Sequence, residues 1–345
     1  MKLATYKDGS RDGQLVVVSR DLTTAHYATG IASRLQQALD DWNFISPQLQ
    51  DLSDTLNHGK ARHAFPFDAA QCLAPLPRAC QRLVGAAYVS PAELLRTAPG
   101  QADAPGAAEP RLRQAHSDEL LGPRAPIAVA SEDFGADLGP ELAVLTGDVP
   151  QAATPEQGLD AVRLLLLAND VCLRGLLADP LDDPLAESAP HLWPATAFAP
   201  VAVTPDELGE AWQGGRAQLT LQVVLNGRKL GLCDSGADMR WHFGQLIAQA
   251  ARTRRLRAGS LIGSGPVHSA GSEQGGRREW PRGFARLADK RAVEALQDGA
   301  PKTGYLRPGD AVRIEAKGKD GESVFGAIEQ ELRAFGAAPA PDFRR

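Results

Sequence analysis

The chain has 345 residues, of which 43% are hydrophobic and 23% charged, and its formal net charge is −5. A chain of this length can bury a sizeable core, in two or three domains or in one large domain with an appendage. The negative charge argues against a nucleic-acid partner, because phosphate binding needs a basic surface. The first residues contain no apolar signal region, and no apolar run reaches the roughly 20 residues of a membrane span. We therefore expect a cytoplasmic protein with no membrane partner.

Residues 1–80 are expected to form a small N-terminal module. The apolar run at 15–18 follows a turn and predicts a buried strand. Apolar residues at helical spacing predict a helix over 31–42, and a second helix is expected over 46–56. The two prolines within 74–77 force an extended chain and close the module.

Residues 81–119 are expected to form a linker and a pre-core segment, because their middle part is rich in Ala, Pro and Gly and lacks periodicity. Residues 120–335 are expected to form the main domain, and 336–345 a disordered tail. The pair Asn226-Gly227 predicts a hairpin turn, and residues 243–254 predict the clearest helix of this domain. Strands are predicted at 127–129, 142–145, 164–167, 219–225 and 311–315.

Five motifs follow one another in the second part of the chain. They are Glu141–Gly147, Leu167–Arg174, Pro194–Pro200, the stretch from Asn226 to Gly265, and Leu306–Glu315. Together and in this order they resemble the fumarylacetoacetate hydrolase family. The resemblance implies an α/β (α+β) fold with a mixed β-roll core and a small N-terminal α/β module, usually in a homodimer. It also implies hydrolysis of a carbon–carbon bond in a β-diketone or oxo acid, with Mg²⁺ or Ca²⁺ as a Lewis acid on the substrate oxygens.

The metal site implied by the resemblance needs three carboxylates, because hard cations prefer oxygen ligands. Glu141 and Asp170 stand at two of these positions, but Gly139 stands at the third. Asp137 is the candidate replacement on the same strand face, although we expect it to be a solvent-facing loop residue. Affinity for Mg²⁺ or Ca²⁺ is therefore expected to be weak or absent, and Gly139→Glu is expected to strengthen it.

The resemblance also implies a general base and groups that bind the substrate. His116 is the candidate base, since imidazole titrates near neutral pH and Asp118 stands close enough in sequence to orient it. Gln114 and Arg174 are the candidate substrate-binding residues. Trp193 replaces a lysine of the family pattern, and indole offers one neutral donor in place of an ammonium group.

A third departure from the family pattern is Pro266, which stands where a threonine hydroxyl is usual, and His268 is a further polar candidate nearby.

Three functions remain open. The first is a working metal-dependent hydrolase that acts on an oxo acid or β-diketone. The second is a catalytically impaired or repurposed paralogue, a pseudoenzyme that binds a ligand or pairs with another subunit. The third is an enzyme with altered chemistry that needs no metal.

Overall fold

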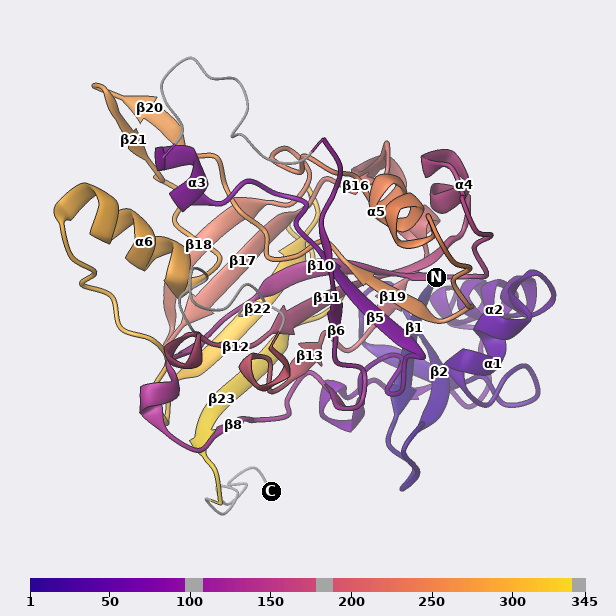
Figure 1. Ribbon diagram of the computed structural model, residues 1–345. Helices are drawn as coiled ribbons and strands as arrows, with labels where there is room; N and C mark the ends of the chain where they lie inside the picture. The colour runs from indigo at the N-terminus through magenta and orange to yellow at the C-terminus, as the bar shows by residue number, and fades with distance from the viewer. Residues whose placement is uncertain (97–107, 178–188, 337–345) are drawn as a thin grey trace.

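The computed structural model describes residues 1–96, 108–177 and 189–336. The predicted tail at 336–345 therefore lies outside the described residues, apart from Gly336. Two large sheets form the body of the described chain, and helices lie around them (Figure 1). In the described ranges, no helix has the length and apolar character that a bilayer crossing requires.

The larger sheet has 12 strands and joins the N-terminal module to the rest of the fold. Ten strands follow one another in space, β4 (Phe65–Pro66), β3 (Thr24–Tyr27), β2 (Gln14–Val18), β1 (Lys2–Tyr6), β14 (Ala202–Val203), β11 (Val162–Asp170), β10 (Pro140–Thr146), β19 (Ser260–Gly263), β5 (Gln81–Gly85) and β6 (Leu112–Ala115). Beside β11 lie β13 (Thr196–Phe198) and β7 (Leu120–Leu121). Most neighbours are antiparallel, but β5 runs parallel to β19. The segment expected as a linker thus supplies β5 and β6 to this sheet.

The second sheet has five strands and closes the other side of the core. Its order is β18 (Arg228–Asp234), β17 (Thr220–Leu225), β22 (Ala311–Lys317), β23 (Ile328–Ala334) and β8 (Ile127–Val129). The predicted hairpin joins β17 to β18, and Leu225 pairs with Arg228 across it. Asn226 and Gly227 both have positive φ, as this two-residue turn demands.

Three short ribbons, six α-helices and several short 3-10 helices complete the described part of the fold. The ribbons pair β9 (Ala136–Asp137) with β12 (Cys172–Leu173), β15 (Trp212–Gln213) with β16 (Arg216–Ala217), and β20 (Ser272–Gln274) with β21 (Arg277–Glu279). The helices are α1 (Leu35–Asp40), α2 (Trp42–Asn57), α3 (Pro91–Arg96), α4 (Pro155–Asp160), α5 (Phe243–Ala250) and α6 (Leu287–Asp298). In Figure 1, α1 and α2 lie beside the N-terminal strands, and α3 and α6 lie at the opposite end.

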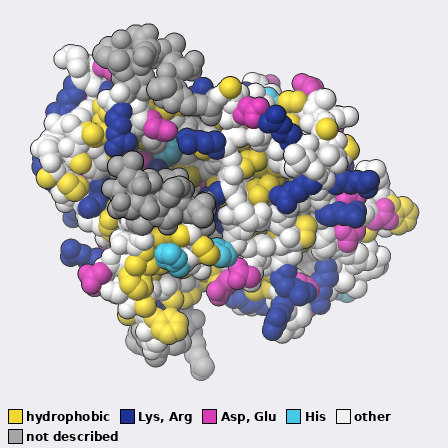
Figure 2. Space-filling view, viewed as in Figure 1, with side chains coloured by type: hydrophobic (Ala, Val, Ile, Leu, Met, Phe, Trp, Pro, Cys, Tyr) yellow, Lys and Arg dark blue, Asp and Glu magenta, His cyan; other side chains and the backbone are white. Residues whose placement is uncertain are grey.

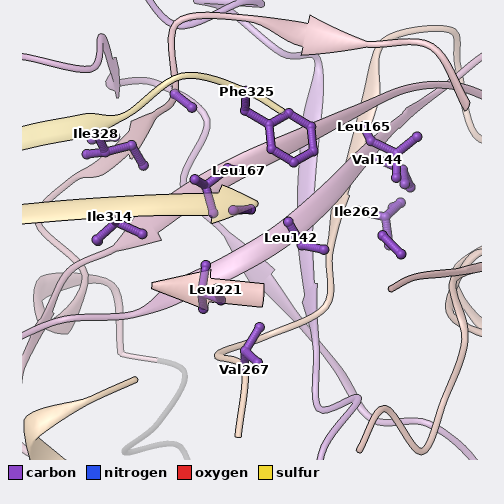
Figure 3. Close-up of a cluster of buried hydrophobic side chains, with 14 of the residues drawn as sticks. Leu142, Val144, Leu165, Leu167, Leu221, Ile262, Val267, Ile314, Phe325 and Ile328 are labelled. Atoms are coloured by element: carbon purple, nitrogen blue, oxygen red, sulfur yellow. The ribbon is translucent and has the colours of Figure 1, made fainter. Parts of the chain in front are cut away.

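Apolar side chains cover both faces of the large sheet. On one face, Leu142, Val144, Leu165 and Leu167 point toward the second sheet and pack with its side chains, as Figure 3 shows. On the other face, Ala143 and Leu145 join a second cluster that includes the side chains of α1 and α2. Strands buried on both faces carry continuous apolar runs, which explains the unbroken run of leucines in β11.

The predicted fold class is confirmed, and the predicted strands are all present. The predicted helix over 31–42 is wrong in its bounds, because α1 begins only at Leu35 and ends at Asp40, and after the single residue Asp41 the helix α2 begins. The helix α6 was not predicted, although it contributes a residue to the site described next.

Candidate active site

Three charged side chains meet on one face of the large sheet. Glu141 lies on β10, Asp170 ends β11, and Arg82 lies on β5. Glu141 faces Ala168 in the antiparallel register, so Asp170 lies two residues further on the same face. All three side chains are only 1% exposed.

Arg82 bridges the two carboxylates. Its Nη2 donates to Glu141 Oε1 at 2.9 Å and lies 3.0 Å from Asp170 Oδ1. To do so the side chain must reach across β19, which separates β5 from β10. Gly263 of β19 makes this possible, since a Cβ there would lie 2.5 Å from Glu141 Oε2. Because Gly263 has no side chain, the Glu141 carboxylate can occupy the space above β19.

The remaining carboxylate oxygens also have partners. Glu141 Oε2 accepts a hydrogen bond from the Gly265 backbone N–H at 2.8 Å. Asp170 Oδ1 accepts one from the Thr196 hydroxyl at 2.7 Å, and Asp170 Oδ2 pairs with Arg113. Each of the four oxygens therefore faces at least one protein donor.

The two carboxylates differ in their proton affinity. Burial raises the pKa of Glu141 to about 7, and Arg82 opposes this only in part. Burial acts in the same direction on Asp170, but Arg82 and Arg113 together outweigh it and hold its pKa below the ordinary value. Asp170 contacts both guanidinium groups and accepts a hydrogen bond from Thr196, whereas Glu141 contacts Arg82 alone and its pKa is raised further by the nearby charge of Asp170.

These residues do not fit a divalent cation. A metal that bridged Glu141 and Asp170 would need the point that Arg82 Nη2 occupies, since hard cations sit about 2.0–2.6 Å from their oxygen ligands. The third ligand position offers no room either. A Cβ on Gly139 would lie 2.1 Å from the backbone oxygen of Asp170. No group of three or more His, Cys, Asp or Glu side chains suited to a metal occurs among the residues that the structure describes.

A cavity of about 500 Å³ opens beside this cluster. Its lining is basic and contains five arginines, Arg96, Arg111, Arg113, Arg174 and Arg286, with Glu93 as an acidic neighbour. By contrast, basic and acidic side chains are interspersed over the molecular face that Figure 2 shows. Cys172 also lines the cavity, but burial raises the pKa of its thiol to about 11, so it is no thiolate at neutral pH.

His268 lines the same cavity and pairs with a buried carboxylate. Its Nδ1 lies 2.8 Å from Asp289 Oδ2, on the first turn of α6. Arg286 donates to both oxygens of Asp289 and places its Nη2 3.5 Å from His268 Nε2. Burial would raise the pKa of Asp289, but Arg286 and His268 outweigh it and hold the pKa well below the ordinary value. The carboxylate therefore stays ionised and accepts the Nδ1 proton, which leaves Nε2 as the acceptor.

Asp137 is not the solvent-facing loop residue that we expected, since it is fully buried. Its Oδ1 accepts hydrogen bonds from the backbone N–H groups of Leu138 and Leu287, both at 2.9 Å, and its Oδ2 lies 3.4 Å from Arg174 Nε. Because the first N–H groups of a helix lack partners within the helix, Asp137 acts as a cap for α6. The partners of its carboxylate are the neighbouring Leu138 N–H, this helix start and Arg174, not Glu141 or Asp170.

The other predicted site residues are scattered. Arg174 lines the cavity, and its guanidinium carbon lies 5.9 Å from the Trp193 ring. Gln114 donates to the Arg82 backbone oxygen at 3.1 Å, from the neighbouring strand β6. His116 is 40% exposed, lies 3.5 Å from Asp118, and contacts the Pro190 backbone oxygen at 3.0 Å. Neither Gln114 nor His116 is among the described residues that line the cavity.

Sequence reasoning missed Arg82, Arg113 and the pairing of His268 with Asp289. Arg82 carried a signal, because it directly precedes the apolar pair Leu83-Val84 in a short predicted strand, where a charged side chain is unusual if buried. Arg113 and Asp289 carried no comparable signal, since both positions are ordinary for exposed strands and helix starts.

Comparisons with known proteins agree with this architecture. The family model of the fumarylacetoacetase N-terminal domain 2 matches residues 1–78, and that of the fumarylacetoacetate hydrolase C-terminal domain matches residues 82–333. A search of curated proteins found no match.

Several solved structures share the fold at low sequence identity. Fumarylacetoacetate hydrolase from psychrophilic Exiguobacterium antarcticum is 19% identical, with a TM-score of 0.64 over 97% of this chain and 99% of the other. Maleylpyruvate hydrolase from Sphingobium sp. SYK-6, in complex with manganese(II) and pyruvate, is 15% identical, with a TM-score of 0.60 over 97% and 99%. The 2-hydroxyhepta-2,4-diene-1,7-dioate isomerase from Mycobacterium marinum is 16% identical, with a TM-score of 0.55 over 98% and 100%.

The C-terminal model covers most of the chain, and the N-terminal model covers most of what precedes it. The chain therefore belongs to the fumarylacetoacetate hydrolase family.

Proposed function

We propose that this chain is an enzyme that binds an oxo acid in the basic cavity and hydrolyses a carbon–carbon bond in it, with His268 as the general base. The observation that carries the proposal is the pairing of His268 with Asp289 in the wall of a cavity lined by arginines. Family membership supports the reaction class, since the solved relatives include hydrolases and an isomerase named for oxo or hydroxy acids.

The arginines suit an acidic substrate. Guanidinium groups bind carboxylates through paired N–H donors, and such charge-assisted bonds are among the strongest in proteins. Arg113 and Arg174 approach the Trp193 ring, at 3.6 Å and 5.9 Å from its centroid. A substrate carboxylate or enolate oxygen that enters the cavity would meet these two side chains.

His268 supplies the proton transfer. With its Nδ1–H donated to Asp289, the Nε2 lone pair can take a proton from a water molecule that displaces the long 3.5 Å contact with Arg286 Nη2, and the resulting hydroxide adds to a carbonyl carbon of the substrate. The bond to the neighbouring carbon then breaks, and its electron pair becomes an enolate. The cavity guanidinium groups stabilise this anion. The imidazolium returns the proton to the enolate carbon, so that one water is consumed and two acids are released.

The alternative is a repurposed paralogue that binds an oxo acid without reaction. The closure of the Glu141 and Asp170 pair by Arg82 favours it, because the metal chemistry implied by the family resemblance has no place there. A single turnover assay separates the enzyme from the binding paralogue.

The assay supplies a 2,4-dioxo acid, 2,4-dioxopentanoate, and follows the appearance of acetate and pyruvate by NMR. We expect turnover by the wild type and a loss of about 10²–10⁴-fold in His268→Ala, the usual contribution of a general base. His58→Ala is the matched control, since His58 lies at the end of α2. If turnover depended on His116 instead, the general base would be the residue that the sequence suggested. If the wild type showed no turnover, the binding paralogue would be favoured.

A further inference from the structure

We infer that a pair of arginines replaces the divalent cation of this site. Arg82 bridges Glu141 and Asp170 beneath the cavity, and Arg113, which pairs with Asp170, offers its remaining N–H donors to a carboxylate or enolate oxygen of the ligand. The inference rests on the proposed function only for the class of the ligand, an oxo acid. It makes the site independent of metal.

Arg82 fills the cation position completely. Its side chain is 1% exposed, and one nitrogen lies within 3.0 Å of an oxygen from each carboxylate. Four adjacent strands, in the order β11, β10, β19 and β5, fix this geometry, and Gly263 of β19 leaves the passage between Arg82 and the two carboxylates. A divalent cation would have to displace a guanidinium that is 1% exposed and paired with both carboxylates.

The carboxylate set is also too small for a metal. Gly139 cannot carry a side chain without moving the Asp170 backbone, since its Cβ would lie 2.1 Å from that backbone oxygen. Asp137 caps α6 and pairs with Arg174. Two carboxylates remain, and when both are ionised their two negative charges are balanced by the positive charges of Arg82 and Arg113. The cluster is therefore neutral without a metal ion, as a buried ionic group needs to be.

Arg113 is the member of the pair that reaches the ligand. Its side chain is 17% exposed and lines the cavity, whereas Arg82 lies behind it. The guanidinium carbon stacks 3.6 Å from the Trp193 ring centroid, and Asp170 holds one edge of the group. A guanidinium has five N–H donors, so donors remain for a ligand after this contact.

Trp193 gains a role from this arrangement. An aromatic face holds a guanidinium by cation–π attraction and by stacking, and it holds the plane of the group as an ammonium neighbour could not. The tryptophan in place of a lysine and the arginine in place of a metal ion are thus parts of one change. Two arginines thus supply the positive charge that the family resemblance assigns to a lysine and a divalent cation.

Two titrations test the inference. In the first, MnCl₂ alone is added to the wild type, and free Mn²⁺ is followed by electron paramagnetic resonance. We expect no binding beyond that of a Glu141→Gln protein. Stoichiometric binding that disappears in both Glu141→Gln and Asp170→Asn would overturn the inference.

In the second titration, oxalate, a planar dianion that mimics an oxo-acid enolate, is added in excess EDTA and followed by calorimetry. We expect binding by the wild type, with affinity reduced about 10- to 100-fold in Arg113→Gln, the range for one charge-assisted hydrogen bond. Arg113→Lys keeps the charge and should fall between them, while Arg163→Gln, away from the cavity, should match the wild type. Circular dichroism establishes that each variant is folded.

Oxalate binding that appears only after Mn²⁺ is added would contradict the inference, and so would equal binding by folded Arg113→Gln or no binding by the wild type. The proposed function fails separately. If oxalate binds without metal but the dioxo acid is not hydrolysed, the two-arginine site stands and the proposed activity fails. If hydrolysis requires Mn²⁺, the proposed activity stands and the metal-free site fails.

Discussion

Replacement of Arg82 by methionine should destabilise the protein in a way that depends on pH. Methionine keeps much of the aliphatic side chain but leaves Glu141 and Asp170 buried with one guanidinium fewer. Removal of one partner from a buried ion pair costs about 3–5 kcal/mol. Because Arg82 serves two carboxylates, we expect the upper part of this range when both are ionised.

Protonation of Glu141 should relieve part of the loss. Its pKa is about 7 in the folded protein against an ordinary value of 4.5. A carboxyl whose folded pKa is raised keeps a proton that the unfolded chain releases, so its contribution to stability falls as pH rises from 4.5 through about 7. Without Arg82 the pKa of Glu141 in the folded protein rises further. Each additional pKa unit lowers the free energy of unfolding at high pH by about 1.4 kcal/mol. The variant should therefore lose more stability on the alkaline side of this window than on the acidic side.

Urea unfolding at a pH below the window and at a pH above it measures this difference, with Arg163→Met as the control. Arg163 is half-buried and donates to the Asp160 backbone oxygen at 2.7 Å, so its loss removes no buried carboxylate partner. We expect Arg82→Met to lose at least about 1.4 kcal/mol more at the higher pH than at the lower. A loss that is equal at both pH values, or as small as that of Arg163→Met, would refute the charge argument.

Three further changes have defined outcomes. Gly139→Ala should destabilise the fold by about 1–3 kcal/mol in urea unfolding, since its Cβ overlaps the Asp170 backbone oxygen; a stable variant would mean that a ligand side chain fits there. Asp137→Asn should cost roughly 1–3 kcal/mol through lost bonds to α6 without altering the Mn²⁺ titration, and a change in that titration would return Asp137 to the metal ligands. Trp193→Ala should weaken oxalate binding and Trp193→Phe should largely restore it, because stacking needs an aromatic face; equal affinities would remove the tryptophan from the site.

Local pattern was enough to predict much of the sheet framework. The apolar runs of β10 and β11 and the Asn226-Gly227 turn follow from side-chain alternation and turn chemistry, which depend on neighbours in sequence. The period of two also put Glu141 on a definite face of its strand. Family motifs then brought Asp170 to the same face, and the structure places the two carboxylates around one nitrogen atom.

The contents of the site depend on contacts between distant segments, which local pattern does not contain. Arg82 meets Glu141 across an intervening strand, 59 residues away in sequence, and only the strand order makes them neighbours. His268 finds Asp289 on a helix whose start is capped by Asp137, from a third part of the chain. Gly139 and Trp193 looked like separate losses in the sequence. In space, Gly139 lies against the Asp170 backbone, and Trp193 stacks on Arg113, which pairs with Asp170.

The most direct measurement is a crystal structure of the protein grown with Mn²⁺ and oxalate, with anomalous diffraction recorded at the manganese absorption edge. Arg82 is expected to remain between Glu141 and Asp170, with no manganese peak there and oxalate density against Arg113. A manganese peak that bridges the two carboxylates, with Arg82 displaced, would contradict the account.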